Sequence, residues 1–171
     1  MKKFTLYSMV PCYVCIMMLL ARCTNDNTPM SAAQSSAVKD SVTQMLAHIS
    51  VDVSTRGPAA WINYFENNAG FFMSSDGTLA FRDYPSAKSL TLGPVVKNFK
   101  KISLNWKNLR VDPLTATYAS LGADFHEDIN MANGQNQTID GYFTATAHFD
   151  GNRWKLRNMN WSVRTPVKPG R

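Results

Sequence analysis

Cysteine is scarce in this chain of 171 residues, and its three copies, Cys12, Cys15 and Cys23, all lie near the N-terminus. Because no cysteine follows position 23, no disulfide can stabilise the rest of the chain, whose fold must depend on an apolar core. Cys12 and Cys15 have the C-x-x-C spacing of redox and zinc sites, but they lie in an apolar run without further ligands. We interpret this spacing as incidental, and a disulfide-rich scaffold is excluded.

Histidine is also rare. His48, His126 and His148 are widely separated, and they do not form the ligand spacing of a metal site. The sequence therefore predicts no metal and no cofactor.

Most of the chain lacks a strong charge of one sign. The net charge is +6, but beyond residue 22 it falls to +3, with fifteen basic against twelve acidic residues. The one local group of lysines, within residues 97–107, is interpreted as a solvated helix end. Nucleic-acid binding requires a basic stripe interleaved with exposed aromatic side chains, so we expect no nucleic-acid partner.

The first 22 residues have the layout of a secretory signal peptide. Lys2 and Lys3 precede an uncharged, mostly apolar run over residues 4–20, and the small residue Ala21 follows. A retained membrane anchor is the alternative, because the run is about the minimum length that spans a bilayer. We interpret residues 1–22 as a signal peptide, which predicts that the chain is exported.

The sequence Leu20-Ala21-Arg22-Cys23 resembles a bacterial lipobox, in which the cysteine is lipidated and becomes the mature N-terminus. Leu20 and Ala21 fit the pattern, whereas Arg22 stands where a small residue is expected. Lipidation of Cys23 would place the protein in the periplasm or on the outer surface, with the lipid anchor as its only membrane contact. Soluble export is the alternative.

The next part of the chain is a polar stretch followed by helices. Residues 23–35 lack an apolar rhythm, which is typical of a flexible tether. Residues 36–53 carry apolar side chains at steps of three and four, which predicts a helix. A second, short helix is expected from Pro58, and a third over residues 86–101, bent at Gly93-Pro94.

Strands dominate the remainder. Two short strands flank a compact turn, and four longer ones follow, over residues 71–73, 78–81, 102–111, 115–130, 138–149 and 153–163. The dipeptides Asn133-Gly134 and Asp150-Gly151 favour tight turns between antiparallel strands. Helices followed by an antiparallel meander predict an α+β domain over residues 36–165, with a disordered tail at 166–171.

Two stretches resemble a known superfold: FENNAGFFMSSDGTL, residues 65–79, and DGNRWKLRNMNWSV, residues 150–163. They are similar to the second helix with the first hairpin, and to the final strand, of the nuclear transport factor 2-like superfold, and within it of SnoaL-like and ketosteroid-isomerase-like domains. The resemblance implies a cone-shaped fold, with three N-terminal helices packed on a curved, mainly antiparallel sheet around an apolar cavity. Because this scaffold serves isomerases, cyclases, dehydratases and binding proteins, it does not imply one reaction.

The resemblance does not extend to the family's catalytic groups. Aligned without gaps, the carboxylate base of ketosteroid isomerases falls at Met73 and their second acid at Ala145, and neither side chain can transfer a proton. SnoaL-like relatives commonly end in His-Trp-Ser, and this chain has Asn160 in place of the histidine. These departures argue against inherited isomerase or cyclase chemistry.

The final strand begins with Trp154 and Leu156 on one face. If these two residues enter the core, strict alternation places Asn158 and Asn160 on the same inner side, facing the cavity. A buried amide without a partner costs about 1–3 kcal/mol, so these two would need a ligand, water or backbone partner. Alternatively, neighbouring strands satisfy them.

The same alternation places Met159, Trp161 and Val163 on the outer face. An exposed apolar patch of this kind is typical of a contact surface. We therefore expect a homodimer that forms through the outer face of the sheet.

Asp124 and His126 are the remaining acid–base pair, on one face of the strand over residues 115–130. The alternation of small and apolar residues along this strand sends them outward, which requires a bulge or a loop longer than two residues. A strict two-residue turn at Asn133-Gly134 would instead pair Asp124 with Phe143 and turn both inward. We favour the outward placement, because four residues in alternation outweigh one turn.

These patterns predict a cell-envelope module that binds an unknown small apolar ligand, without evident catalysis. The predicted pocket is lined by aromatic side chains and oriented by two amides: Trp61, Tyr64, Phe81, Trp106, Asn158 and Asn160. The alternative is an enzyme of the isomerase, dehydratase or polyketide-cyclase type that uses Asp124 and His126 in the same pocket. A structural dimer with a vestigial pocket is a third possibility.

Overall fold

The computed structural model describes residues 29–164. The predicted signal peptide, Cys23 and the predicted C-terminal tail lie outside the described residues. Within the described part of the chain, no helix combines the length and apolar character needed to cross a membrane.

The long helix α2 covers Ala32–Arg56. The Ser31 side chain accepts a hydrogen bond from the Gln34 N–H, and the Gln34 side chain accepts one from the Ser31 N–H, which forms a capping box. Gly57 ends the helix with φ at 82°, a conformation that favours glycine. Because the capping box precedes the first apolar position, the helix begins four residues earlier than the periodicity indicates, and residues 32–35 of the predicted tether are helical.

One face of α2 is buried against the sheet. It carries the apolar residues of the predicted helical pattern: Val38, Val42, Met45, Leu46, Ile49 and Val53. Each such side chain contributes about 1.5–3 kcal/mol when it leaves water. Hydrogen bonds at Leu104 also join α2 to the sheet: the Leu104 N–H donates to the Ser54 hydroxyl at 3.0 Å, and the Ser50 hydroxyl donates to the Leu104 carbonyl.

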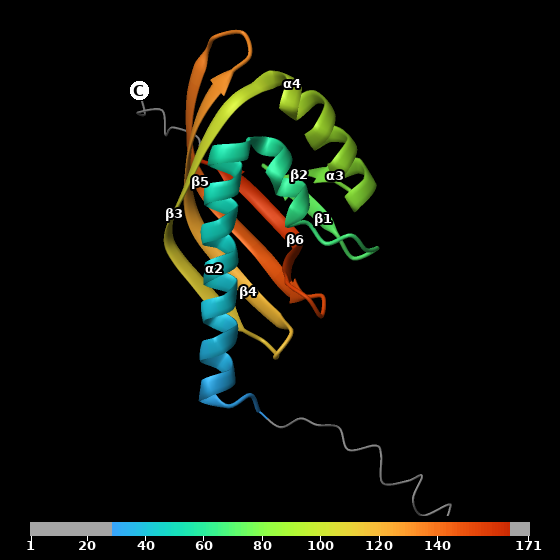
Figure 1. Ribbon diagram of the computed structural model, residues 1–171, viewed down its shortest axis with the longest axis vertical. Coiled ribbons are helices and arrows are strands. Elements are labelled where there is room, and N and C mark those ends of the chain that lie inside the picture. Colours follow the sequence, from blue (N-terminus) through green and yellow to red (C-terminus); the bar gives the residue numbers. More distant parts are fainter. Residues whose placement is uncertain (1–28, 165–171) are drawn as a thin grey trace, which may run out of the picture.

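Six strands form one curved, mixed sheet with the order β2-β1-β6-β5-β4-β3 (Figure 1). The strands are β1 (Phe72–Ser75), β2 (Thr78–Phe81), β3 (Phe99–Pro113), β4 (Tyr118–Met131), β5 (Asn136–Phe149) and β6 (Trp154–Val163). All neighbouring pairs are antiparallel except β1 and β6, which run parallel. Helices therefore pack on a curved, mainly antiparallel sheet, and the predicted α+β cone is confirmed.

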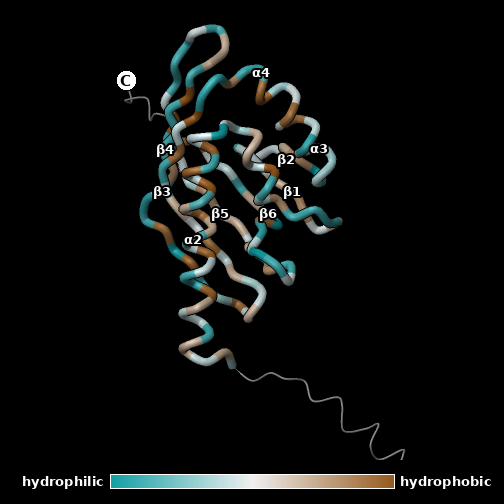
Figure 2. The backbone as a smooth tube through the Cα atoms, viewed as in Figure 1, coloured by the Kyte–Doolittle hydropathy of each residue, from teal (hydrophilic) through white to brown (hydrophobic). Residues whose placement is uncertain are grey.

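Shorter helices complete the helical layer. They are η2 (Pro58–Asn63, a 3₁₀ helix), α3 (Tyr84–Leu90), η3 (Thr91–Val95, a π-helix) and α4 (Val96–Asn98). The predicted bend at Pro94 thus takes the form of a π-helical stretch between two α-helical pieces. Hydrophobic residues recur along α2 and along the α3–α4 segment in Figure 2, as expected of helices that cover a core.

The pairing of β4 with β5 fixes which residues face the core. Asp124 pairs with Tyr142 rather than with Phe143. The reason is the loop: the Met131 N–H donates to the Gln135 carbonyl at 2.8 Å, which leaves more than two residues in the connection. Small and apolar residues at odd positions of β4 are therefore buried, whereas the even positions, which include Asp124, face outward.

A β-bulge in β6 reverses the faces that strict alternation predicts. Leu156 pairs with Ala147 and Asn158 pairs with Thr146, so Arg157 has no partner across from it. One extra residue shifts the side-chain period by one position. Leu156 still enters the core, but beyond the bulge the odd residues point inward and the even residues point outward.

Side chains from three segments surround the bulge. Arg157 lies 3.5 Å from a Glu66 carboxylate oxygen and donates to the Tyr118 hydroxyl at 3.4 Å, and the other Glu66 oxygen binds His148. Gly70 leaves room for the guanidinium, because a Cβ there would lie 2.2 Å from an Arg157 nitrogen. These contacts hold the extra residue in place and so set the direction of every later side chain in β6.

Candidate functional site

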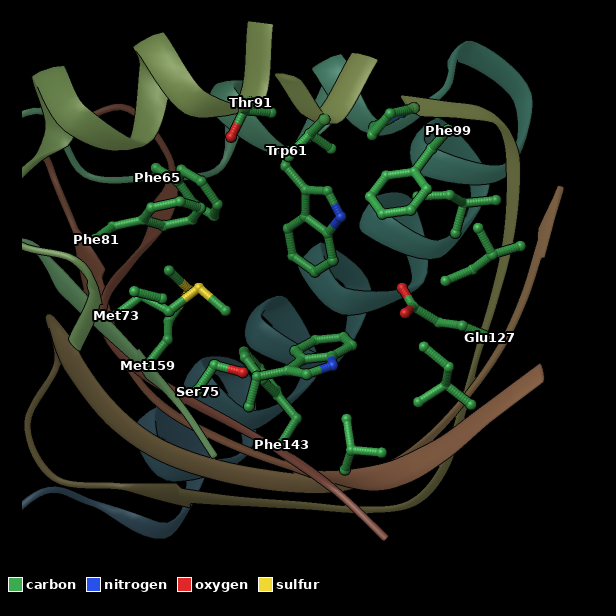
Figure 3. Close-up of a pocket in the computed structure, with 18 residues that line it drawn as sticks. Trp61, Phe65, Met73, Ser75, Phe81, Thr91, Phe99, Glu127, Phe143 and Met159 are labelled. Carbon is green, nitrogen blue, oxygen red and sulfur yellow. The ribbon is translucent and has the colours of Figure 1, made fainter. Parts of the chain in front are cut away.

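A cavity of about 380 Å³ lies between the concave face of the sheet and the short helices (Figure 3). The lining residues within the described chain are mostly apolar: Pro58, Trp61, Phe65, Met73, Ser75, Ala80, Phe81, Thr91, Val95, Phe99, Ile102, Glu127, Ile129, Ile139, Phe143, Met159, Trp161 and Val163. This size and character are typical of small-molecule sites in proteins. The apolar cavity implied by the resemblance is therefore present.

Trp161 stands at the centre of the aromatic wall. Its ring centroid lies 4.0 Å from that of Phe125, and it meets the ring of Trp61 edge-on at 5.8 Å. Trp106 packs behind both tryptophans and donates its indole N–H to the Leu46 carbonyl at 3.0 Å. Such packing fixes the rings, so the cavity is formed by side chains that cannot easily collapse into it.

Glu127 is the one ionisable side chain among the eighteen lining residues of the described chain. It lies on the inner face of β4, paired with Leu104 on β3 and Ile139 on β5, and is only 7% exposed. None of the hydrogen bonds or ion pairs among residues 29–164 involves its carboxyl group. In Figure 3 the carboxyl points into the cavity, below Trp61 and Phe99.

Burial without a partner changes the acidity of this group. Desolvation raises the pKa of Glu127 from 4.5 to about 7. Within the described chain, no side-chain nitrogen or oxygen that is sealed from solvent lacks a hydrogen bond. The unpaired Glu127 carboxyl must therefore be reached through the cavity, where a ligand or water can meet it.

Two hydroxyl groups also line the cavity. Thr91 is 4% exposed, begins the π-helical stretch η3 and points its hydroxyl toward the cavity in Figure 3. Ser75 belongs to β1, and its hydroxyl makes a weak 3.4 Å contact with Asp76. The cavity thus offers one carboxyl group and a few neutral polar groups on an apolar background.

Three of the four aromatic residues predicted to line the pocket lie at the cavity or behind its wall, and one lies elsewhere. Trp61 and Phe81 line the cavity, and Trp106 packs behind its wall. Tyr64 does not reach it, because its hydroxyl donates to the Asp52 carboxylate at 2.6 Å on the side of α2. Burial and this bond raise the pKa of Tyr64 to about 12.

The predicted inward placement of Asn158 and Asn160 is wrong. Both lie beyond the bulge on the outer face of β6, where Asn158 donates to the Gly70 carbonyl at 3.1 Å. Asn160 accepts from the Ser74 hydroxyl at 2.9 Å and donates to the Ser162 hydroxyl at 2.9 Å. Neighbouring protein groups therefore satisfy both amides, as the alternative interpretation holds.

The predicted outer patch of Met159, Trp161 and Val163 is also wrong. All three residues line the cavity, and Met159 is only 3% exposed. The bulge at Arg157 is the physical reason, because it exchanges the two faces. The homodimer stays a prediction, but these residues do not supply its surface.

Asp124 and His126 lie on the outer face and do not reach the cavity. Asp124 pairs with Arg164 and accepts from the Asn108 amide at 2.7 Å. His126 Nδ1 lies 2.9 Å from Asp140, and this hydrogen bond is the main reason that the His126 pKa is raised. The structure therefore contradicts the enzyme hypothesis that places this pair in the pocket.

Sequence reasoning missed Glu127, although a signal was present. Along β4 the buried residues fall at every second position, Ala119, Leu121, Ala123 and Phe125, and the next member of that series is Glu127. A carboxylate on a face otherwise made of apolar side chains is unusual. No group of three or more potential metal ligands occurs in residues 29–164.

Comparison with known proteins identifies the fold. No protein-family model matches the sequence, and no curated protein is significantly similar to it. Among solved structures, a candidate scytalone dehydratase from Novosphingobium aromaticivorans has a TM-score of 0.69 at 14% identity, covering 82% of this chain and 94% of that one.

Two further structures are similar to the chain. LinA has a TM-score of 0.65 at 17% identity, covering 80% of this chain and 92% of that chain. A nuclear transport factor 2-like superfamily protein from Salmonella enterica has a TM-score of 0.66 at 15% identity, covering 79% and 96%. At such low identities the similarity shows a shared fold, and it does not extend to the chemistry of these proteins. The chain has the nuclear transport factor 2-like fold.

Proposed function

We propose that this chain binds a small, largely apolar molecule in the cavity of the cone. The observation that carries the proposal is the 380 Å³ cavity walled by aromatic and aliphatic side chains, with few polar groups. The fixed aromatic wall supports it, since a preformed site loses less conformational entropy when a ligand binds. Two of the similar structures described above carry the names of a dehydratase and of LinA, which is consistent with small molecules entering this scaffold.

The cavity volume limits the size and affinity of the ligand. At roughly 30 Å³ for each water-sized atom in a liquid, the space holds on the order of a dozen non-hydrogen atoms. At about 0.5 kcal/mol for each atom, the binding free energy is about 6 kcal/mol, which corresponds to a dissociation constant of tens of micromolar. A binding assay must therefore be sensitive in the micromolar range.

Filling the cavity tests the proposal. Ala80 lines it from β2, so Ala80→Trp would occupy part of the space. We expect small aromatic probes to change the tryptophan fluorescence of the wild-type protein, and we expect this variant to lose that change. Ala116→Trp, at an exposed loop position, is the matched control and should retain it. Equal binding by both variants would place the ligand elsewhere.

Location in the cell envelope is part of the same proposal, because the N-terminal segment has the layout of a lipoprotein signal. Radiolabelled palmitate should be incorporated into the full-length chain and not into Cys23→Ser. Release of the wild-type protein without lipid would support soluble export instead.

A proton-transfer enzyme is the second candidate, and the pKa of Glu127 near 7 favours it. A general base works best when its pKa is close to the operating pH. Deuterium exchange from heavy water into carbon acids that fit the cavity should then require Glu127, and exchange that persists in Glu127→Gln would exclude this role.

A further inference from the structure

We propose that the ligand is a monocation, a small apolar amine whose ammonium group pairs with Glu127 while its apolar part fills the aromatic cavity. This inference rests on the proposed binding function and names the chemical class of the ligand. It follows from three features of the cavity: an unpaired carboxyl group, the absence of another charge on the lining, and the aromatic rings around it.

The first feature is a carboxyl group without a protein partner. Glu127 is more than nine-tenths buried, yet no donor among residues 29–164 binds its oxygens. A buried carboxylate without a partner is costly, and proteins normally supply it with a cation or several hydrogen bonds. A contrast lies in the same chain: buried Glu66 binds His148 and lies beside Arg157. The free oxygens of Glu127 face the cavity, so the donor that completes this carboxylate comes from what occupies the cavity, and a bound ligand displaces the water there.

The second feature is the charge of the lining. None of the other seventeen lining residues of the described chain is ionisable. An anionic ligand would therefore face Glu127 without any compensating cation. A neutral ligand can donate a hydrogen bond to the carboxylate, but it leaves the negative charge without a counter-ion. A ligand with one positive charge is the class that satisfies the group fully.

The third feature is the aromatic wall. In Figure 3 Trp61 and Phe99 lie on one side of the Glu127 carboxyl, and Phe143 lies across the cavity from them. The face of an aromatic ring attracts a cation within about 6 Å of its centroid, most strongly for tryptophan. An ammonium group at the carboxyl would thus have a counter-ion and aromatic neighbours, and its alkyl or aryl part would occupy the apolar remainder of the cavity.

Two isosteric probes test the charge requirement. Phenylbutylamine and phenylbutanol have the same number of non-hydrogen atoms and differ in one polar terminus, and both are of the size that the cavity holds. We expect the amine to bind the wild-type protein at least about tenfold more tightly than the alcohol at pH 8, measured by calorimetry and by tryptophan fluorescence. The amine preference should also decrease from pH 8 to pH 6, as Glu127 takes up a proton.

Glu127→Gln removes the charge and keeps the shape. We expect this variant to bind the alcohol as the wild type does and to lose the preference for the amine. Asp128→Asn is the matched control, because it removes a carboxylate from the adjacent position on the outer face of β4. It should keep the amine preference.

The outcomes separate the two proposals. Equal binding of amine and alcohol by the wild type, or an amine preference that persists in Glu127→Gln, would overturn the cation assignment while leaving a binding cavity supported. Tighter binding of phenylbutanoate than of the amine would also overturn it. Failure of all three probes to bind would overturn the proposed function together with the inference.

Discussion

Replacing Glu127 by glutamine should change how the stability of the protein depends on pH. The pKa of this carboxyl rises from 4.5 to about 7 on folding, because the cavity wall removes it from bulk water. Between these two values the folded chain binds a proton that the unfolded chain has released. The free energy of unfolding of the wild type therefore falls as pH rises through this window.

The magnitude follows from the shift. Each pKa unit corresponds to 1.36 kcal/mol, so the wild type should lose about 2–3 kcal/mol of stability between pH 5 and pH 8 through this one group. Glutamine has nearly the same shape but no charge. The unfolding free energy of the variant, minus that of the wild type, is the quantity to compare. This difference should be about 2–3 kcal/mol larger at pH 8 than at pH 5.

Urea unfolding followed by circular dichroism at both pH values measures this difference. Comparing variant with wild type cancels the other titrating groups that both share. Asp112→Asn is the control, because Asp112 is exposed on β3 and contacts Arg110 rather than a histidine; it should show no comparable change. A difference between Glu127→Gln and wild type that is the same at pH 5 and pH 8 would show that the carboxyl is not desolvated, and the reasoning about the cavity would fail.

Four further predictions concern other parts of the molecule. Trp161→Ala should lower the unfolding free energy by about 3–5 kcal/mol in urea titrations, because it empties the centre of the aromatic wall; a loss below about 1 kcal/mol would contradict that packing. Deleting Arg157 should keep a cooperative unfolding transition, because Leu156 and Asn158 pair with adjacent residues of β5 and strict alternation then turns Met159 inward as before; loss of that transition would contradict the bulge. Asp140→Asn should lower the pKa of His126 in an NMR titration, because Asp140 is the main cause of its rise; an unchanged pKa would contradict the hydrogen bond. Sedimentation equilibrium should give the mass of two chains, and the mass of one chain would contradict the predicted homodimer. Trp161→Ala should leave that mass unchanged, because Trp161 lines the cavity and does not lie on the outer face.

The order and type of the secondary-structure elements could be predicted from local patterns, because apolar periodicity and turn residues act over a few positions. The apolar positions of α2 and the alternation along β4 and β5 match the structure. The second helix shows the limit. A helical period groups Trp61 with Tyr64, but the helix ends at Asn63, and the Tyr64 hydroxyl donates to Asp52 instead.

The faces of β6 could not be predicted, because one residue decides them. Nothing in the neighbouring sequence of Arg157 indicates a bulge, and its stabilising contacts come from Glu66 and Tyr118, far away in the chain. The error then spreads to all later positions, from Asn158 to Val163. Glu127 is a different case, since the alternation along β4 already places it on the buried face.

The most direct test of the binding site is a crystal structure of the protein soaked with phenylbutylamine at saturating concentration. We predict electron density for the compound inside the cone, between Trp61 and Met159, with its nitrogen within hydrogen-bonding distance of the Glu127 carboxyl. A cavity that stays free of the compound, or one that the side chain of Trp61 has moved to fill, would contradict the account.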